Sequence, residues 1–209
     1  MPAFDPECVS CPRLAGHLAE VRKEFPDYHA RPVAPFGATD PRLLIVGLAP
    51  GLHGANASGR PFTGDFAGIL LYNTLYKFDF SSAPISESRN DGLQLKGCRI
   101  TNAVKCLPPQ NKPTGTEVAT CNRYLALEIG QLAPGTTILA LGAIAHGAVI
   151  RALGLRARDY PFGHGNTHSL DNDRWLIDSY HCSRYNTQTK RLTNKMFRDV
   201  FRRAKKLLG

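Results

Sequence analysis

The chain has 209 residues, 43% of them hydrophobic, which is enough for one domain with a sizeable core. Its 26 Lys and Arg residues outnumber 17 Asp and Glu residues, and the net charge of +9 favours an anionic partner such as nucleic acid over a merely solvated basic face. No apolar run approaches the ~20 residues of a membrane span, and the first residues lack the basic start and apolar stretch of a secretory signal. We therefore expect a cytoplasmic protein without membrane contacts.

Short apolar runs alternate with helical patterns along the chain. The runs predict buried strands at residues 42–48, 98–104, 136–141 and 174–180. The helical patterns cover residues 12–24, 66–77, 116–131, 143–153 and 193–208. This alternation predicts an α/β fold, namely a three-layer α/β/α sandwich around a central, mostly parallel four-stranded sheet, in a single domain over residues 1–209.

Two of these helices carry further signals. In the helix at 66–77, four side chains share one face: Ile69, Leu70, Asn73 and Tyr76. The helix at 116–131 begins beside the sequence TGTE, which is typical of a capping box. Before the last helix, Thr193 or Asn194 is suited to the N-cap position.

Ligands of parallel sheets bind beyond the carboxyl ends of the strands. This rule selects four loops as candidate sites, at residues 47–65, 102–115, 142–146 and 181–190. The polar, Ser-rich stretch at 78–97 is instead predicted to be a surface excursion.

Four of the six cysteines form two pairs. Cys8 and Cys11 make a C-x2-C pair, Cys106 follows a strand, and Cys121 lies in the next helix. Four converging thiolates suit a tetrahedral zinc ion or an iron–sulfur cluster, and the softness of sulfur does not choose between them. Unligated core cysteines are the alternative. Of the remaining two cysteines, Cys98 lies at the start of a strand and is expected to be buried. Cys182 lies in a candidate site loop but lacks a neighbouring base that would make it a nucleophile.

The Gly-rich loop GLAPGLHGANASGRPFTGDFAG, residues 47–68, contains neither G-x-x-x-x-G-K-[ST] nor G-x-G-x-x-G. It carries five polar or aromatic side chains of interest: His53, Asn56, Arg60, Phe62 and Asp65. An acid, an aromatic face and amide donors together suit a pocket for a flat polar ring.

The loop SYHCSRYNTQTKRLT, residues 179–193, places His181 at the carboxyl end of the last strand. Its hydroxyl and amide groups suit phosphate or sugar contacts, and its basic residues add positive charge. A polar loop that only caps the last helix is the alternative.

Three motifs, GLAPGLHGANASGRPFTGD, TNAVKCLPP and HCSRYNTQT, together with the four paired cysteines, resemble the uracil-DNA glycosylase superfamily. Within it they are most similar to the iron–sulfur branch called family 5, or type b, over roughly residues 8–190. The resemblance implies a monomeric, nucleoid-associated DNA repair enzyme. Such an enzyme flips uracil, hypoxanthine or a modified pyrimidine out of DNA and hydrolyses its N-glycosidic bond.

The resemblance also implies a 4Fe-4S cluster held by Cys8, Cys11, Cys106 and Cys121, with a structural role. For the base-binding site it implies that Phe62 stacks on the flipped base and that Asn102 reads the edge of that base. The surrounding backbone would come from the first motif, at Gly47, Ala49 and Gly51.

For catalysis, the resemblance implies that His181 stabilises the departing base. Family 4 has an acidic residue directly after the first Gly of the first motif, whereas this chain has Leu48 and then Ala49. The absence of an acid there shifts the handling of water to Asp65 or His53.

Four residues of the third motif are expected to contact DNA: Ser183, Arg184, Tyr185 and Asn186. Among them, Tyr185 occupies the place of the residue that wedges into the duplex. No lysine lies at the presumed centre of the motifs, although Lys105 and Lys190 are near in sequence. We therefore expect a monofunctional glycosylase that leaves an abasic site uncut.

Two rival hypotheses stay open. One is a base glycosylase of broader or family 4-like specificity. The other is a non-catalytic nucleic-acid-binding module with a structural metal site. The loop histidines His164 and His168 are expected either to contact DNA phosphates or to be solvated.

Overall fold

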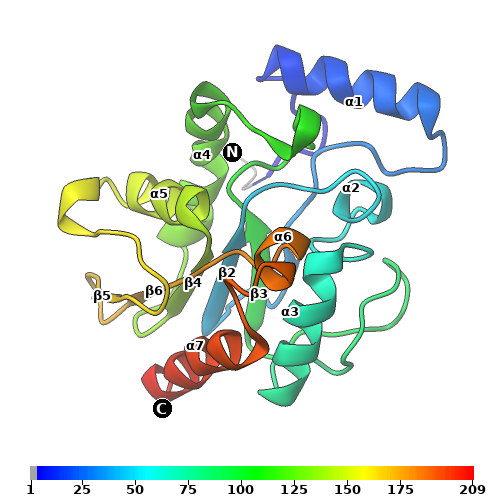
Figure 1. Cartoon of the computed structure of the whole chain (residues 1–209). Coiled ribbons are helices and arrows are strands. Elements are labelled where there is room, and N and C mark those ends of the chain that lie inside the picture. The colour runs from blue at the N-terminus through cyan, green and yellow to red at the C-terminus, as the bar shows by residue number, and fades with distance from the viewer. Residues whose placement is uncertain (1–3) are drawn as a thin grey trace.

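The computed structural model describes residues 4–209, which form one central sheet with helices on both faces (Figure 1). The strand order is β1-β3-β2-β4-β6-β5. The four inner strands are parallel to one another and confirm the four predicted strands: β2 (Leu43–Gly47), β3 (Cys98–Asn102), β4 (Thr137–Leu141) and β6 (Trp175–Ser179).

Across residues 4–209 the sheet has six strands, however, and not the four that were predicted. Two antiparallel edge strands complete it, β1 (Phe36–Gly37) beside β3 and β5 (Thr167–Ser169) beside β6. They have two and three residues. Such short segments are held by pairing with a neighbour and carry no hydrophobic period of their own, so the sequence did not reveal them.

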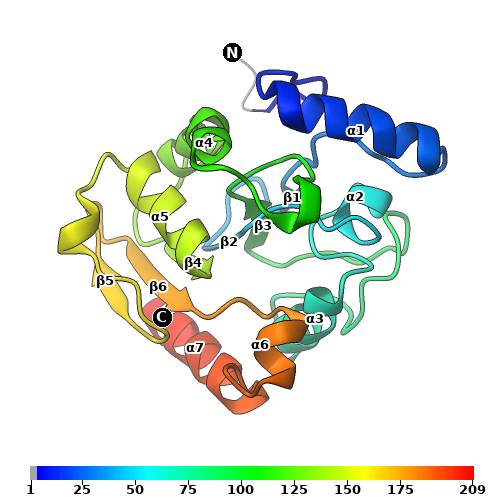
Figure 2. The ribbon, with the colours of Figure 1, turned by 45° about the horizontal axis from the view of Figure 1, so that its top comes forward.

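Two layers of helices cover the sheet, as Figure 2 shows. The helices α3 (Phe66–Lys77) and α7 (Asn194–Leu207) pack on one face, and α4 (Gly115–Gly130) and α5 (Ala143–Ala152) pack on the other. Alternate residues of each strand point to opposite faces. In β2, for example, Ile45 packs in the core with α3 and α7, whereas Leu44 packs in the core with α4 and α5. The predicted three-layer α/β/α sandwich is confirmed.

The remaining helices lie around this sandwich. The helix α1 (Pro12–Glu24) packs beside α4 in a third apolar cluster that also contains the four paired cysteines. The short helices α2 (Ala55–Ser58) and α6 (Arg184–Gln188) lie in two of the loops selected as candidate sites, and 3-10 turns occupy Pro109–Asn111 and Ala157–Asp159.

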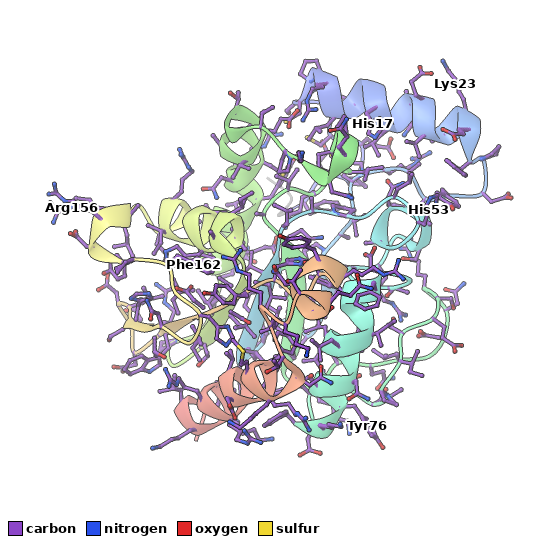
Figure 3. The ribbon with its side chains drawn as sticks, viewed as in Figure 1. His17, Lys23, His53, Tyr76, Arg156 and Phe162 are labelled. Carbon is purple, nitrogen blue, oxygen red and sulfur yellow. The ribbon has the colours of Figure 1, made fainter. Side chains whose placement is uncertain are left out.

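The helix α3 corrects one expectation from the sequence. Of the predicted face, Ile69 and Tyr76 are 65% and 48% exposed, and Figure 3 shows Tyr76 pointing outward from α3. The buried side chains of α3 include Leu71, Tyr72 and Leu75 instead. Because α3 is apolar on nearly all sides, periodicity alone did not identify the face that the sheet covers.

Both predicted caps form. Thr114 and Glu117 make the capping box at the start of α4, and the Thr193 hydroxyl accepts from the Met196 N–H at the start of α7. Across the part of the chain that the structure describes, no helix is long and apolar enough to span a membrane.

Candidate active site and cysteine cluster

A pocket of about 420 Å³ opens at the carboxyl end of the parallel strands. Its lining comes from the Gly-rich loop and the start of α3, from the end of β3 and the turn after it, and from the loop after β6: Leu48, Ala49, Gly51, Phe62, Asp65, Phe66, Ala67, Asn102, Asn111, His181, Ser183 and Arg184. Chain segments far apart in sequence thus meet where an α/β sheet is expected to bind its ligand.

The ring of Phe62 forms an aromatic surface of this pocket. Phe62 and His181 stack with ring centroids 6.0 Å apart and an angle of 26° between the planes. The backbone of Phe62 is left-handed, with φ of 57°. Gly47 leaves room for this arrangement, because a Cβ there would collide with the Phe62 ring and with the Asn102 amide.

The Asp65 carboxylate lies against the same loop, at the start of α3. Its Oδ2 accepts a hydrogen bond from the backbone N–H of Ala55 at 3.1 Å. Gly51 and Gly54 allow the carboxylate to approach, since a Cβ at either position would meet its oxygen atoms. Burial raises the pKa of Asp65 above its ordinary value, and the Ala55 hydrogen bond only partly offsets this effect.

The imidazole of His181 has no ring hydrogen bond to any residue that the structure describes. Its backbone carbonyl is fixed by the Asn186 Nδ2, which donates to it at 2.8 Å. Burial lowers the pKa of His181 to about 4. The ring is therefore neutral near pH 7, with one N–H donor to offer into the pocket.

The Asn102 side chain is 3% exposed, and within the described chain its Oδ1 has no hydrogen-bond partner. An unpaired buried polar atom costs ~1–3 kcal/mol. A ligand that supplies the missing partner recovers that cost. Asn102 thus brings an unpaired buried acceptor to the lining of the pocket.

The rim of the pocket comes from the short helix α6 and the residue before it. Ser183 caps α6 through the Asn186 N–H, so part of this loop does serve as a helix cap. The Arg184 guanidinium lies 5.3 Å from the centre of the Phe66 ring. Tyr185, the next residue of α6, is 70% exposed.

His53 is the one proposed catalytic side chain that lies elsewhere. Its Nδ1 is 2.9 Å from the Tyr28 hydroxyl, and it lines a separate hollow with Arg89. Figure 3 shows His53 on the flank of the molecule beside α2. Conversely, Phe66 and Asn111 line the pocket but were not among the predicted site residues. Asn111 lies in a left-handed turn with φ of 57°, a geometry that no motif signalled.

The two loop histidines are half-buried and not freely solvated, and their contact with DNA phosphates stays a prediction. The Nδ1 of His164 accepts the backbone N–H of Tyr180 at 3.1 Å, and the two rings stack. His168 packs beside buried Asp178, with 3.5 Å between the His168 Nε2 and a carboxylate oxygen. Both residues therefore lie against β6 or the residue that follows it.

Cys8, Cys11, Cys106 and Cys121 surround one hollow between α1, α4 and the loop after β3. Two N–H groups point at their sulfur atoms, from the Lys105 backbone to Cys121 at 3.3 Å and from the Arg123 side chain to Cys8 at 3.4 Å. Burial, reinforced by the neighbouring thiolates, raises the pKa of Cys106 to about 12. A raised pKa opposes deprotonation of the thiol, and a positively charged metal centre would favour the four thiolates instead.

The spacing of the sulfur atoms bears on the kind of metal. Zn–S bonds of about 2.3 Å put the sulfurs of a tetrahedral zinc site only ~3.8 Å apart. Among the described residues, one group of three metal-ligating atoms lies within 4.8 Å of one another, namely His146, His168 and Asp178, and no three of the cysteines do so. Within the described residues, the four cysteines therefore offer sulfur ligands around one hollow without a preassembled site for a single tetrahedral ion.

The two lysines near the motifs are not in the pocket. Lys105 is 1% exposed, and its Nζ lies 2.6 Å from the Glu128 Oε1 in a buried ion pair. Lys190 is exposed beyond the end of α6 and does not line the pocket.

This arrangement defines an α/β protein whose pocket combines an aromatic surface and an unpaired amide with a carboxylate and a neutral imidazole. Sequence comparison agrees with that class. The profile of the uracil DNA glycosylase superfamily matches residues 34–205.

The chain is similar to the type-5 uracil-DNA glycosylase of Thermus thermophilus, with 46% identity covering 97% of this chain and 94% of the relative. It is similar to the type-5 uracil-DNA glycosylase of Mycobacterium leprae, with 44% identity covering 97% and 92%. A type-4 uracil-DNA glycosylase of Pyrobaculum aerophilum is 39% identical, but the match covers only 55% of this chain and 51% of the relative. The chain belongs to the uracil-DNA glycosylase superfamily, in its type-5 branch, as the motifs predicted.

Proposed function

We propose that this protein is a DNA repair glycosylase that extrudes uracil or another deaminated base and hydrolyses the N-glycosidic bond. The observation that carries this proposal is the convergence of Phe62, Asn102, Asp65 and His181 on one pocket at the carboxyl edge of the sheet. Each of these side chains has chemistry that one step of the reaction needs.

Binding of the base falls to Phe62 and Asn102. An extruded base loses its stacking partners, and an aromatic ring restores ~1–3 kcal/mol of stacking per base. The unpaired Asn102 amide supplies hydrogen bonds to the polar edge of the ring. Leu48 and Ala49 line the pocket without an acid, which fits a site that accepts several deaminated bases.

Cleavage of the glycosidic bond leaves positive charge on the sugar and negative charge on the departing base. A neutral His181 donates an N–H to that base, and this kind of stabilisation is usually the largest catalytic contribution. The Asp65 carboxylate orients water toward the sugar and stabilises its positive charge. Asp65 is assigned this role over His53 because Asp65 lines the pocket and His53 does not.

The chain carries a net charge of +9, so its Lys and Arg side chains would bind the phosphates of the DNA backbone electrostatically. Arg184, which lines the pocket, would contact a phosphate, and the neighbouring exposed Tyr185 ring would fill the gap that the extruded base leaves. All of these groups come from one chain, so the proposed active unit is a monomer. Because the proposed substrate is DNA, the proposed location of the protein is at the nucleoid.

Cys8, Cys11, Cys106 and Cys121 would hold a 4Fe-4S cluster, whose contribution is to join α1, α4 and the loop after β3 covalently. Lys105 is engaged by Glu128, and the pocket residues include no lysine. The product is therefore an uncut abasic site.

The decisive experiment is excision from a labelled duplex that contains one uracil. Alkali should cut the DNA after incubation with the enzyme, whereas samples without alkali should stay intact. Parallel duplexes with hypoxanthine, xanthine or a thymine mismatch measure breadth of specificity. A protein that binds these duplexes and releases no base would instead be a non-catalytic nucleic-acid-binding module.

A further inference from the structure

The backbone at Phe62 is strained. A bulky residue in the left-handed region is uncommon and persists only where its surroundings impose it. Two contacts on the α3 side help to impose it. The Tyr72 hydroxyl donates to the Pro61 carbonyl at 2.8 Å, and Gly68 lies so close to the Phe62 carbonyl that a Cβ would collide with it.

A third restraint comes from Arg60, two residues before Phe62. Arg60 is the single Lys or Arg of the Gly-rich loop, and at 5% exposed its side chain is buried and does not face solvent. Its guanidinium donates to the Asp91 Oδ1 at 2.7 Å, to the Ser86 Oγ at 3.0 Å and to the Arg89 carbonyl. The same group lies over the Phe36 ring, 4.4 Å from its centre. Arg60 is thereby fixed on several sides.

The acceptor Asp91 belongs to the segment at 78–97, which the sequence marked as a surface excursion. Besides Arg60, Asp91 accepts the backbone N–H groups of Glu87 and Leu93, each at 2.9 Å. Although burial opposes ionisation, these hydrogen bonds lower the pKa of Asp91 to about 2. One carboxylate therefore both organises the excursion and holds Arg60.

We propose that the segment at 78–97 positions the stacking ring, because its Asp91 anchors Arg60 and thereby keeps Phe62 in the strained conformation that faces the pocket. This inference rests on the proposed function, in which Phe62 stacks on an extruded base. Neither Arg60 nor Asp91 lines the pocket, so both are positioning residues. The thermodynamic signature of such a role is that it disappears when the ring itself is absent.

The test is a double-mutant cycle on single-turnover excision of uracil from a duplex. Asp91→Asn should lower the rate about tenfold, since small displacements of a positioning group are costly. Duplex affinity should change by less than about twofold, because phosphate contacts dominate it. In the Phe62→Ala background, Asp91→Asn should change the rate by less than about twofold.

The matched control is Glu128→Gln, which also converts a buried ion-paired carboxylate to an amide but lies beside Lys105, away from Phe62. The fold-decreases in excision rate caused by Glu128→Gln and by Phe62→Ala should multiply in the double variant, which is the result for two uncoupled residues. If Asp91→Asn disrupts folding, as thermal unfolding would show, Ser86→Ala provides a milder break, since Ser86 contacts both Arg60 and Thr63.

Three results would overturn the inference. The first is an Asp91→Asn rate equal to that of the unmodified enzyme. The second is an effect of Asp91→Asn that is as large with Ala at position 62 as with Phe. The third is full activity of Phe62→Ala, which removes the stacking role on which the inference stands. Failure of the unmodified enzyme to excise uracil would reject the proposed function itself, and this inference with it.

Discussion

The ring of Phe62 lies nearly parallel to the imidazole of His181, with 26° between the two planes. One residue belongs to the loop after the first parallel strand, and the other to the loop after the last of these strands. Their contact joins the aromatic surface that would bind a base to the polar group that would stabilise its departure. Binding and chemistry can therefore be tested separately at adjacent residues.

Asp65→Asn should lower the single-turnover rate of uracil excision by about a hundredfold, because the variant loses the negative charge beside the developing cation. Burial raises the pKa of Asp65, so the unmodified enzyme should gain activity with rising pH as this carboxyl ionises. The excision rate of Asp65→Asn should lack this rise with pH, because the amide does not ionise. Asp79→Asn is the control, since Asp79 is an exposed carboxylate outside the pocket. Equal rates for Asp65→Asn and the unmodified enzyme would reject the assignment.

His181 should remain neutral throughout the range in which histidines usually titrate. Because burial lowers its pKa to about 4, its ring NMR signals should shift only in strongly acidic solution. His181→Ala should lower the excision rate about a hundredfold, the cost of one lost donor to a developing anion. His17→Ala on α1 should leave the rate unchanged. A His181 titration near its ordinary pKa of 6.5 would contradict the neutral-donor role.

Cys106→Ser should remove most of the iron and the visible absorbance of the purified protein and lower its melting temperature, since the α1 region would lose its covalent anchor. Cys98→Ala is the matched control, because Cys98 is buried in β3 and does not line the cysteine hollow. Elemental analysis distinguishes the alternatives. Zinc in place of iron, or no metal at all, would overturn the cluster assignment.

His146 should make stability depend on pH. Its two ring nitrogens face acceptors, the Asp178 Oδ1 at 2.7 Å and the Tyr160 carbonyl at 2.8 Å, so only the doubly protonated ring satisfies both. Burial opposes this charge, but the hydrogen bond and charge of Asp178 raise the pKa of His146 above 6.5.

The contribution of His146 is therefore complete below pH 6.5 and is lost as pH rises through the higher pKa of the folded protein. Chemical denaturation at a series of pH values should show the free energy of unfolding falling over that interval. Asp178→Asn should abolish this fall and lower stability by about 3–5 kcal/mol at pH 6. An equal pH dependence in the variant would contradict the role of the pair.

Borohydride should trap no covalent complex between the enzyme and uracil-containing DNA. A trapped complex requires an amine that attacks the sugar, and the nearest lysine in sequence, Lys105, is held by Glu128 in a buried ion pair. A glycosylase known to cleave the strand serves as the positive control. A trapped band that survives Lys105→Met but disappears in Lys190→Met would show that the exposed lysine reaches the sugar.

The order of apolar runs and helical patterns was enough to predict the four parallel strands, the five long helices and the layered architecture. Each of these elements can be recognised locally, because the pattern of its own apolar and polar side chains marks a buried strand or an amphipathic helix. The same sequence indicated the loops of the pocket, because parallel strands place their carboxyl ends at one edge. Its motifs also identified the superfamily that the comparison then showed.

Only the tertiary structure decided which polar side chains of those loops face the pocket. Arg60 and His53 belong to the same Gly-rich loop as Asp65, yet Arg60 is buried against Asp91 and His53 pairs with Tyr28. Their partners come from other segments of the chain, and no local pattern encodes a contact between distant segments. Sequence alone therefore determined the parallel strands, the layered architecture, the family and most of the candidate groups. Packing between segments separated Asp65, which lines the pocket, from residues that hold the loop in place.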